Sequence, residues 1–391
     1  MTTARPPVRM RKVLALEDLD ARARRFLPRP IYGYVAGGVE QNLSLRANRQ
    51  QFERWSLMPR ALVDVSIRSQ SVQLFGETFA HPFGIAPMGI SALIAYEGDL
   101  SLARAAEAAR IPMMVSATGL IRLEEIKQVA PRSAWYQAYL PGDESQIAAL
   151  VTRVAAAGFT TFTITVDCNM LGNRENLVRV GFSTPLRPTP RLFWDGFIRP
   201  AWTLGTLGRT LAKRGMLHFE NAGVNRGVAV ISRDAQRSFL AREQLNWTHV
   251  ALVRKLWKGR LILKGILSAE DTRMALQHDV DGIVVSNHGG RQLDGAVTPL
   301  QVLPEIIAVK GGMAVMVDSG IRRGTDVLKA LALGADFVFV GRPFIYAAAL
   351  GQQAGVNHAI RILAAEIDRD LGMLGITSLA QMGPNFLRAN S

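Results

Sequence analysis

Residues 281–291, Asp-Gly-Ile-Val-Val-Ser-Asn-His-Gly-Gly-Arg, join an apolar, largely β-branched run to a histidine, two glycines and an arginine. A run of this kind is typical of a strand buried on both faces of a parallel sheet, and the polar residues after it lie at the open end of that sheet. His288 has an ordinary pKa near ~6.5 and can take a proton at neutral pH, while the guanidinium of Arg291 matches a carboxylate. A base beside a carboxylate anchor predicts a site for a hydroxy acid.

Seven other runs of the same kind alternate with helical patterns from residue 82 onward. Capping or acidic residues such as Asp99, Ser268 and Asp326 indicate where helices start. The expected strands are 83–86, 113–116, 135–139, 162–167, 261–264, 282–287, 314–318 and 337–341. Eight strand–helix alternations in roughly 260 residues predict an α/β protein with a TIM (β/α)8 barrel, whereas a doubly wound sheet more often has about five to seven strands.

Polar side chains stand at or just after the C-terminal ends of most of these strands. They are Ser116, Gln137, Tyr139, Thr165, Asp167, Lys264, Ser286, Asn287, His288, Asp318 and Arg342. In a TIM barrel this face holds the active site. So many polar residues at one end of so many strands are hard to explain as packing, and they predict an active site there.

The other segments are assigned around this barrel, within a single domain 1–391. Residues 1–81, with a helical pattern over 16–26, are expected to cover one end of the barrel. The barrel takes 82–168 and 247–352, and 353–391 are expected to form C-terminal helices. The interruption at 169–246, after the fourth strand, is far too long for an ordinary barrel loop and is therefore an insertion.

The insertion combines basic and aromatic residues. Its cations are Arg179, Arg187, Arg191, Arg199, Arg209, Lys213, Arg214 and Arg226, and its rings include Phe193, Trp194, Phe197 and Trp202. This pattern fits an anionic membrane surface, where aromatic rings lie at the headgroup level, and it fits equally a folded lid whose rings pack on the barrel. The net charge of +14 also raises nucleic acid as a partner, but no nucleic-acid-binding motif accompanies it, so none is expected.

A phosphate site is indicated at the ends of the last two strands, the usual place for a phosphate in these barrels. Glycine amides and guanidinium groups gather there. The residues concerned are Asp318, Ser319, Gly320, Arg322, Gly341 and Arg342. Since the chain has neither a G-x-G-x-x-G unit opening a helix nor a G-x-x-x-x-G-K-[ST] loop, flavin mononucleotide (FMN) fits better than a nicotinamide or a hydrolysed nucleotide.

Two other strand ends suit a flavin. Lys264 follows Leu-Ile-Leu, which is typical of a strand buried on both faces, and a cation there would stabilise negative charge on a reduced flavin ring. Ala86, Pro87 and Met88 offer backbone at the end of the first strand, and Gly89 would leave room near the side chain of the substrate.

Cysteine content and hydropathy exclude several classes of protein. Cys168 is the only cysteine, so an internal disulfide, an iron–sulfur centre and a cysteine-based metal site are excluded, and no metal is expected. No uninterrupted apolar stretch reaches the ~18 residues of a spanning helix, and the basic N-terminus leads into acidic residues rather than a signal core. We expect a cytoplasmic protein, attached peripherally to the inner face of the cell membrane if the insertion binds lipid.

Together these residues resemble one family. The stretches that match its pattern, in order, are 32–34, 137–139, 165–167 with 171–175, 264–265, 286–294, 318–326 and 341–343. They are similar to the FMN-dependent 2-hydroxy acid oxidases and dehydrogenases, which include glycolate oxidase and the lactate and mandelate dehydrogenases. The likeness runs from about residue 14 to 380, and the Ser-Asn-His-Gly-Gly-Arg-Gln stretch followed by an aspartate is highly specific in this barrel context.

The resemblance implies a role for each matching residue. His288 would be the catalytic base, paired with Asp167 when protonated. Tyr34, Arg174 and Arg291 would hold the substrate carboxylate, and Tyr139 would contact the hydroxyl side. Ser116, Gln137, Thr165, Lys264 and Ser286 would contact the flavin ring, and Asp318, Ser319, Gly320, Arg322, Gly341 and Arg342 would hold the ribityl phosphate. The resemblance also implies a homo-oligomer, a tetramer in many members.

The electron acceptor stays open between two enzymes. Gly89, where glycolate oxidase has alanine, resembles the lactate and mandelate dehydrogenases, and it implies a bulkier substrate and a flavin that reacts poorly with oxygen. We therefore expect an (S)-2-hydroxy acid dehydrogenase that passes electrons to a quinone or another membrane acceptor. The alternatives are an oxidase that releases hydrogen peroxide and, in another class, a membrane-binding flavoprotein without turnover.

Overall fold

The eight predicted apolar runs form a closed barrel of parallel strands, and the computed structural model describes residues 7–183, 189–232 and 242–390. Each strand pairs with the next one along the chain, and the last pairs with the first. The strands are β4 (Phe83–Ile85), β5 (Met113–Ser116), β6 (Ala134–Ala138), β7 (Thr161–Thr165), β8 (Arg260–Ile266), β9 (Gly282–Val285), β10 (Ala314–Val317) and β11 (Phe337–Val340). The predicted TIM barrel is confirmed.

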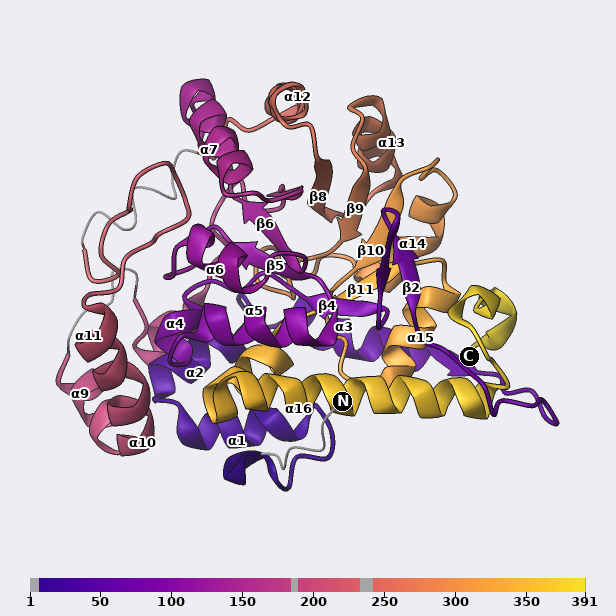
Figure 1. Cartoon of the computed structure of the whole chain (residues 1–391), viewed down its shortest axis with the longest axis horizontal. Helices are drawn as coiled ribbons and strands as arrows, with labels where there is room; N and C mark the ends of the chain where they lie inside the picture. The colour runs from indigo at the N-terminus through magenta and orange to yellow at the C-terminus, as the bar shows by residue number, and fades with distance from the viewer. Residues whose placement is uncertain (1–6, 184–188, 233–241, 391) are drawn as a thin grey trace.

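Helices surround this barrel (Figure 1). They are α4 (Ser91–Ile94), α5 (Gly98–Ala109), α6 (Leu123–Val129), α7 (Glu144–Ala156), α12 (Trp247–Leu256), α13 (Ala269–Gln277), α14 (Pro299–Ile307), α15 (Gly324–Ala332) and α16 (Arg342–Leu374). Side-chain caps start some of them: the Ser268 hydroxyl accepts from the amide of Asp271 at 3.0 Å, and the Asp143 carboxylate accepts from the amide of Gln146 at 2.9 Å. Such caps satisfy amides that have no partner inside the helix.

The inside of the barrel is apolar at one level and polar at the next. Its apolar residues include Met114, Trp135, Ile262, Val284, Met316, Phe337 and Phe339. Because side chains alternate along a strand, the residues two positions further on point into the same interior. Those residues are Ser116, Gln137, Lys264, Ser286 and Asp318. The strand register therefore puts a polar layer on top of an apolar core, at the C-terminal end of the barrel.

The N-terminal segment contacts both ends of the barrel, whereas the sequence predicts a cover for one end. Helices α1 (Asp18–Phe26), α2 (Arg29–Ala36) and α3 (Leu43–Gln50) precede a hairpin, β2 (Val72–Leu74) and β3 (Glu77–Phe79). At the C-terminal end, α3 is bound through the side-chain amides of Asn48 and Asn287, 2.8 Å apart. At the other end, Phe75 packs edge-on against Trp135 and Glu77 pairs with Arg260 at the start of β8. The hairpin therefore covers the apolar interior of the barrel at that end.

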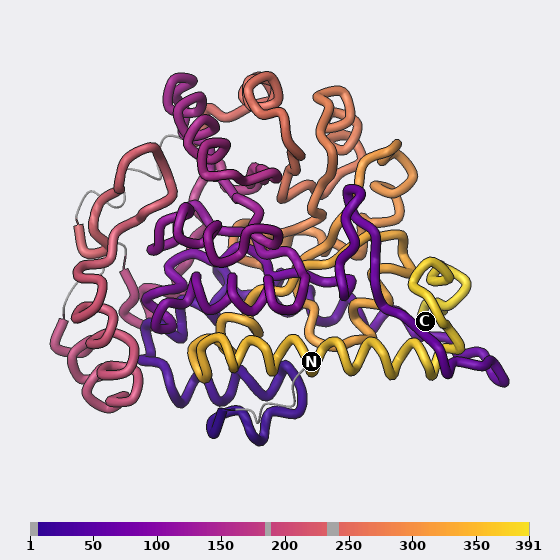
Figure 2. Tube along the Cα trace, in the orientation of Figure 1, coloured from indigo at the N-terminus to yellow at the C-terminus, as the bar shows by residue number. Residues whose placement is uncertain are grey.

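The C-terminal segment is not only helical. Helix α16 is broken at Gly351 and Gln352, and the chain ends in strand β12 (Leu387–Ala389), which pairs antiparallel with β1 (Trp55–Leu57). In the trace of Figure 2, α16 lies beside α1, and the two helices are in contact. Single helical turns occur at η1 (Val8–Met10), η2 (Gln51–Arg54), η5 (Leu379–Gln381) and η6 (Pro384–Phe386). The two ends of the chain are thus tied to each other outside the barrel.

The insertion between β7 and β8 forms short helices. They are α8 (Glu175–Val180), α9 (Pro190–Phe197), α10 (Pro200–Trp202), the π-helical turn η3 (Thr203–Gly208) and α11 (Arg209–Arg214). In Figure 1, α9 to α11 stand at the left, outside the ring of barrel helices. Within the described residues, every helix is too short or too polar to cross a bilayer.

The aromatic residues of the insertion differ in exposure. Trp202 is 4% exposed and its indole donates to the carbonyl of Ile94. Phe193, Trp194 and Phe197 are 71%, 61% and 74% exposed. Arg187 lies outside the described residues.

Candidate active site

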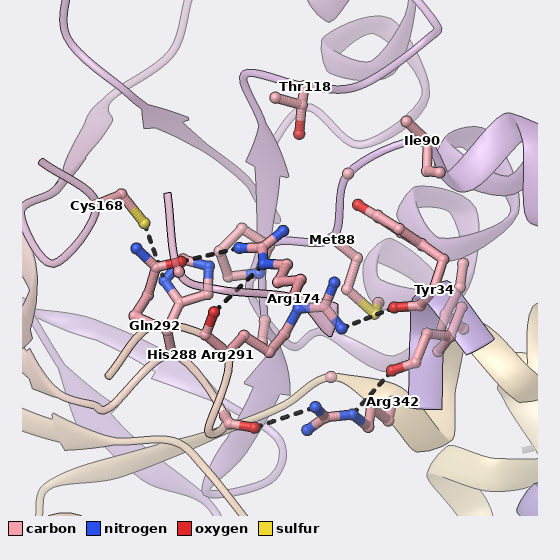
Figure 3. Close-up of a pocket in the computed structure, with 18 of the residues that line it drawn as sticks. Tyr34, Met88, Ile90, Thr118, Cys168, Arg174, His288, Arg291, Gln292 and Arg342 are labelled. Carbon is pink, nitrogen blue, oxygen red and sulfur yellow. Dashed lines mark hydrogen bonds between the residues drawn. The ribbon is translucent and has the colours of Figure 1, made fainter. Parts of the chain in front are cut away.

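A cavity of about 580 Å³ opens at the C-terminal end of the barrel. Its walls come from the loops after β4, β5, β6, β7, β9, β10 and β11, from α2 and from the insertion. Figure 3 shows Cys168, His288, Gln292 and Arg174 grouped on one side of it, and Thr118 and Ile90 set apart from them. This is the face where the sequence predicts the active site.

His288 and Asp167 form a mostly buried pair, with side chains 16% and 11% exposed. The Nδ1 atom of His288 lies 2.8 Å from Oδ1 of Asp167. Burial lowers the pKa of His288, although the Asp167 carboxylate opposes this shift. Burial raises the pKa of Asp167, but His288 and Lys264 outweigh burial, so the pKa of Asp167 is lowered overall. At neutral pH the pair is therefore a carboxylate beside a neutral imidazole. With its Nδ1 proton donated to Asp167, His288 presents the lone pair of Nε2 and can act as a base.

Tyr139 stands on the other side of that imidazole. Its hydroxyl lies 3.5 Å from Nε2 of His288, and burial raises the pKa of the phenol well above its ordinary value. Arg242, from the end of the insertion, places its guanidinium 4.4 Å from the centre of the Tyr139 ring and is 7% exposed. Tyr139 is thus a protonated hydrogen-bond donor beside the base, with a cation on its ring face.

Arg174 and Arg291 line the same cavity. One nitrogen of Arg291 donates to the carbonyls of Tyr34 and Gly37, at 2.7 and 2.9 Å, and Arg174 donates to the side chain of Gln292 at 2.9 Å. Burial and then the neighbouring Arg174 lower the pKa of Arg291 to about 9. Neither guanidinium is ion-paired with a carboxylate among the residues that the structure describes. A guanidinium has five donors, so both retain some for an anion.

The polar layer inside the barrel is internally hydrogen-bonded. The ammonium of Lys264 lies 3.0 Å from Asp318 and 2.9 Å from the hydroxyl of Ser286. Burial lowers the pKa of Lys264, but Asp318 and Asp167 outweigh it and the net pKa is raised, so the lysine is charged. The amide nitrogen of Gln137 donates to Thr165, but its buried oxygen has no hydrogen-bond partner among the described residues. An unpaired buried oxygen is costly unless a ligand donates to it.

Guanidinium groups gather at the other end of the cavity. Burial, then Arg342 and Arg49, lower the pKa of Arg322 to about 10, and burial lowers that of Arg342. Arg342 is fixed by the carbonyls of Val35, Gly37 and Gly289. Within the described chain neither Arg322 nor Arg342 has a carboxylate partner in an ion pair. Partly buried cations close enough for one to lower the pKa of another are a site for an anion.

Glycine backbone faces the cavity beside these cations. A Cβ at Gly341 would meet nothing nearer than Ala86, at 3.7 Å, so its main chain is bare on the cavity side. Gly320 has a φ of +92°, and a Cβ there would lie 1.9 Å from the carbonyl of Asn48. Ser319 also has a positive φ, and its hydroxyl donates to Asp318 and accepts from the amide of Gly289.

The wall near Gly89 is tight. A Cβ at Gly89 would lie 2.2 Å from the hydroxyl oxygen of Thr118 and 3.3 Å from that of Tyr34. The Thr118 hydroxyl therefore occupies the space that a side chain at residue 89 would need, and the room for the substrate depends on Thr118 as well as on Gly89.

Most of the predicted site residues line the cavity. They are Tyr34, Ala86, Pro87, Met88, Gly89, Tyr139, Arg174, Lys264, His288, Arg291, Asp318, Ser319, Gly320, Arg322, Gly341 and Arg342. Ser116, Gln137, Thr165 and Ser286 lie in the polar layer beneath, and Asp167 lies behind His288. Sequence reasoning missed Thr118, Cys168, Arg242 and Gln292, which also line it. For Gln292 a signal existed, since it directly follows Arg291.

These features fit FMN. A phosphate suits the cationic end with its bare glycine backbone, and a ring with hydrogen-bonding edges suits the polar layer that holds the unpaired oxygen of Gln137. Asp318 is the exception, since a carboxylate repels a phosphate, and its ion pair with Lys264 instead suits hydroxyl groups.

The chain is similar to several characterised proteins over nearly its whole length. It is 34% identical to (S)-mandelate dehydrogenase of Pseudomonas putida over 95% of this chain and 93% of that one, and 36% identical to L-lactate dehydrogenase of Xanthomonas campestris pv. campestris over 96% and 97%. It is 36% identical to L-lactate oxidase of Lysinibacillus sphaericus over 94% and 90%. A crystal structure of the monotopic membrane protein (S)-mandelate dehydrogenase superposes with a TM-score of 0.90 at 33% identity, over 97% of this chain and all of that one.

The family model for FMN-dependent dehydrogenases matches residues 23–389. FMN is accordingly the cofactor, and the reaction is the oxidation of a 2-hydroxy acid. With the barrel, the cavity and these likenesses together, the chain belongs to the FMN-dependent 2-hydroxy acid dehydrogenase and oxidase family.

Proposed function

We propose that this enzyme oxidises an (S)-2-hydroxy acid to the 2-oxo acid with His288 as the base. One observation carries the proposal: a neutral imidazole, oriented by a buried carboxylate at 2.8 Å, faces the same cavity as two guanidinium groups without carboxylate partners among the described residues. The name of the mandelate dehydrogenase relative supports the (S) configuration.

Each residue near the base has a distinct task. Arg174 and Arg291 hold the substrate carboxylate and thereby fix the hydroxyl and C2 relative to His288, which converts orientation into rate. Nε2 of His288 accepts a proton from the substrate, either from the hydroxyl or from C2, and Asp167 stabilises the imidazolium that results. Tyr139 donates a hydrogen bond on the hydroxyl side.

Other residues would hold FMN, which when bound supplies a two-electron acceptor for the substrate. Arg322 and Arg342 would bind its phosphate, with backbone of Gly320 and Gly341. Asp318 would accept hydrogen bonds from ribityl hydroxyls rather than touch the phosphate. Four residues of the polar layer, Ser116, Gln137, Lys264 and Ser286, would lie under the flavin ring together with Thr165, which is hydrogen-bonded to Gln137.

The proposal is tested by mixing the holoenzyme anaerobically with a series of 2-hydroxy acids and following the loss of flavin absorbance. At least one (S)-2-hydroxy acid is expected to reduce the flavin quickly, and His288→Gln should abolish that reduction while leaving the oxidised flavin spectrum unchanged. Rapid reduction by the His288→Gln enzyme would refute the role of the base.

We further propose that the electrons pass to a membrane quinone. The exposed aromatic residues of the insertion favour an acceptor at a lipid surface. The competing candidate is an oxidase, because L-lactate oxidase is among the relatives. Reoxidation of the reduced enzyme by a short-chain quinone, compared with air, separates the two: fast reoxidation in air with release of hydrogen peroxide would overturn the quinone proposal.

The insertion is proposed to bind an anionic membrane at the inner face of the cell membrane. Phe193, Trp194 and Phe197 are exposed on or beside α9, with the exposed Arg191 and Lys213 on the neighbouring surface. Three cations of the sequence prediction have other partners: Arg179 pairs with Glu175, Arg214 with Glu97 and Glu125, and Arg226 with Glu220. The monotopic mandelate dehydrogenase structure supports membrane attachment of this kind.

Vesicle flotation tests the membrane proposal. Replacing Phe193, Trp194 and Phe197 by serine should release the enzyme from anionic vesicles, and Arg191→Gln with Lys213→Gln should weaken binding to anionic but not to neutral vesicles. The control is Leu62→Ser with Ile67→Ser, because these apolar side chains are even more exposed, at 105% and 87%, on another part of the chain. Equal flotation of the triple variant and the control would contradict the proposal.

A homotetramer is proposed from the resemblance alone. Light scattering of the detergent-free holoenzyme tests it, and a single-chain mass would contradict it.

A further inference from the structure

Cys168, the only cysteine, lies against the catalytic pair. Its sulfur is 3.3 Å from Oδ1 of Asp167 and 3.4 Å from Nδ1 of His288. The mechanism above gives this sulfur no task. Cys168 and His288 both line the cavity, so a dissolved ion can reach them (Figure 3).

The three ligand atoms have nearly the spacing of a tetrahedral zinc site. Zinc–ligand bonds of about 2.3 Å to sulfur and about 2.0–2.1 Å to nitrogen or oxygen place tetrahedral ligands about 3.5 Å apart for sulfur with either of the others, and about 3.4 Å apart for nitrogen with oxygen. The two sulfur distances already agree within about 0.2 Å with that geometry. Only the 2.8 Å contact between His288 and Asp167 has to lengthen, by about half an ångström, when its proton is replaced by a metal.

A second observation concerns Asp167. Its other oxygen, Oδ2, is buried and has no hydrogen-bond partner among the described residues. If the carboxylate turned so that Oδ2 bound a cation, this oxygen would gain the partner that it lacks. The three ligating atoms all lie within 4.8 Å of one another.

Although the sequence, with its single cysteine, predicts no metal site, we propose that Asp167, Cys168 and His288 form an inhibitory binding site for a borderline-soft divalent cation of the Zn²⁺ class. Three protein ligands and one position open to the cavity are the usual arrangement of an accessible zinc site. Nitrogen and sulfur ligands together favour zinc or cadmium over magnesium or calcium.

The charges and protons of the step balance. The thiol of Cys168 loses its proton to solvent, and the Nδ1 proton of His288 moves to Nε2, so one proton is released for each ion bound. The two charges of the ion are matched by the thiolate and the carboxylate, so the net charge of the site changes from −1 to zero when one proton is released. Because one proton is released for each ion bound, affinity is expected to rise about tenfold for each unit of pH near neutrality.

Metal binding is expected to inhibit the enzyme because it leaves the His288 proton on Nε2. A His288 ring bound to metal at Nδ1 carries its proton on Nε2 and has no lone pair to offer the substrate. This consequence rests on the proposed role of His288 as the base, whereas the binding itself does not.

Calorimetric titration of the holoenzyme with Zn²⁺ in two buffers of different ionisation enthalpy tests the binding. One site per chain with about one proton released is expected, and Cys168→Ser and Cys168→Ala should each weaken it at least about tenfold. Two variants are used so that a folding defect in one does not decide the result. Cd²⁺ should produce a thiolate-to-metal ultraviolet band in the native enzyme and none in either variant. The control is His218→Gln, which removes an imidazole of the insertion and should change nothing.

Inhibition is measured in the same samples as the rate of anaerobic flavin reduction, each variant relative to its own zinc-free rate. Loss of reduction at the concentration that fills the site, spared in both Cys168 variants, supports the proposal. Equal zinc affinity in the native and Cys168 variants overturns it and assigns the ion to other groups. Cysteine-dependent binding without inhibition supports the metal site and overturns His288 as the base, so the two failures are distinguishable.

Discussion

Replacing Asp167 by asparagine removes the charge that stabilises a protonated His288 and keeps the shape of the side chain. The amide oxygen of asparagine can still accept the Nδ1 proton, so the ring keeps its orientation. At the observed 2.8 Å, two unit charges in an effective dielectric constant of about 20 attract each other by at most ~6 kcal/mol. Measured hydrogen bonds to charged groups contribute less, about 1.5–3 kcal/mol.

That range sets the expected effect on rate. Because the imidazolium forms during the reaction, a loss of about 1.5–3 kcal/mol slows substrate oxidation about 10- to 150-fold. Substrate affinity should change little, since Arg174 and Arg291, not Asp167, hold the carboxylate. The variant is thus expected to lose the limiting rate of reduction and to keep the dissociation constant for the substrate.

The pH dependence supplies a second readout. The pKa of His288 is already lowered by burial, and Asp167 opposes that shift. The rate therefore rises with pH through this pKa and is constant above it, because only the neutral imidazole is a base. Without the carboxylate the pKa falls further, so the acidic limb should move to lower pH.

Anaerobic stopped-flow measurement of flavin absorbance across pH gives both quantities. The matched control is Asp143→Asn, which changes an exposed helix-capping aspartate of α7 in the same way and should leave the rate and the limb unchanged. A slowing of less than about tenfold with an unmoved limb would refute the reasoning.

Three further changes test other parts of the structure. Gly89→Ala places a Cβ 2.2 Å from the Thr118 hydroxyl, so it should cost about 1–3 kcal/mol of stability and narrow the substrate range. Adding Thr118→Ala should restore both, as measured by thermal unfolding and by a substrate screen. Arg322→Met should weaken FMN binding about 10- to 150-fold, as measured by flavin fluorescence. It should also raise the Tm of the apoprotein, because it relieves repulsion from Arg342 and Arg49; a lower Tm would contradict this. Burial, then Arg110, lowers the pKa of His81 from 6.5 to about 4. The stability of the protein should therefore be constant above pH ~6.5 and fall by about 2–3 kcal/mol as the pH drops from ~6.5 to about 4. His81→Gln should flatten the Tm profile over this pH range, and an unchanged slope would exclude His81 as its cause.

The barrel could be predicted because its signals are local. Each strand is a short apolar run such as 282–285, and each is followed by its polar residues at a fixed offset, so no knowledge of distant contacts was needed. The closing hairpin and strand β12 could not be predicted in this way. The sequences of β2, β3 and β12 are only three residues long and, unlike β4, contain no continuous apolar run; β12 exists only because β1, more than 300 residues earlier, pairs with it.

The candidate site divides along the same line. Its residues at strand ends, among them His288, Lys264 and Asp318, were found from their positions after apolar runs. Arg242 and Cys168 were not, since the first comes from an insertion without a strand–helix pattern and the second is a single cysteine with no ligand pattern around it. Their surroundings depend on contacts between residues about 100 or more positions apart: Arg242 on the ring of Tyr139, and Cys168 on His288.

By itself, the sequence determined the architecture, the cofactor class and most of the residues that face the cavity, because strand alternation and strand-end chemistry are written in neighbouring residues. Only the tertiary structure decided how those residues affect one another. It put Thr118 in the space beside Gly89, paired Arg214 with two glutamates instead of leaving it free for lipid, and brought one sulfur within 3.4 Å of the base. The physical reason is that charge, burial and distance between side chains are properties of the folded chain, and they set the pKa values and partners on which the chemistry depends.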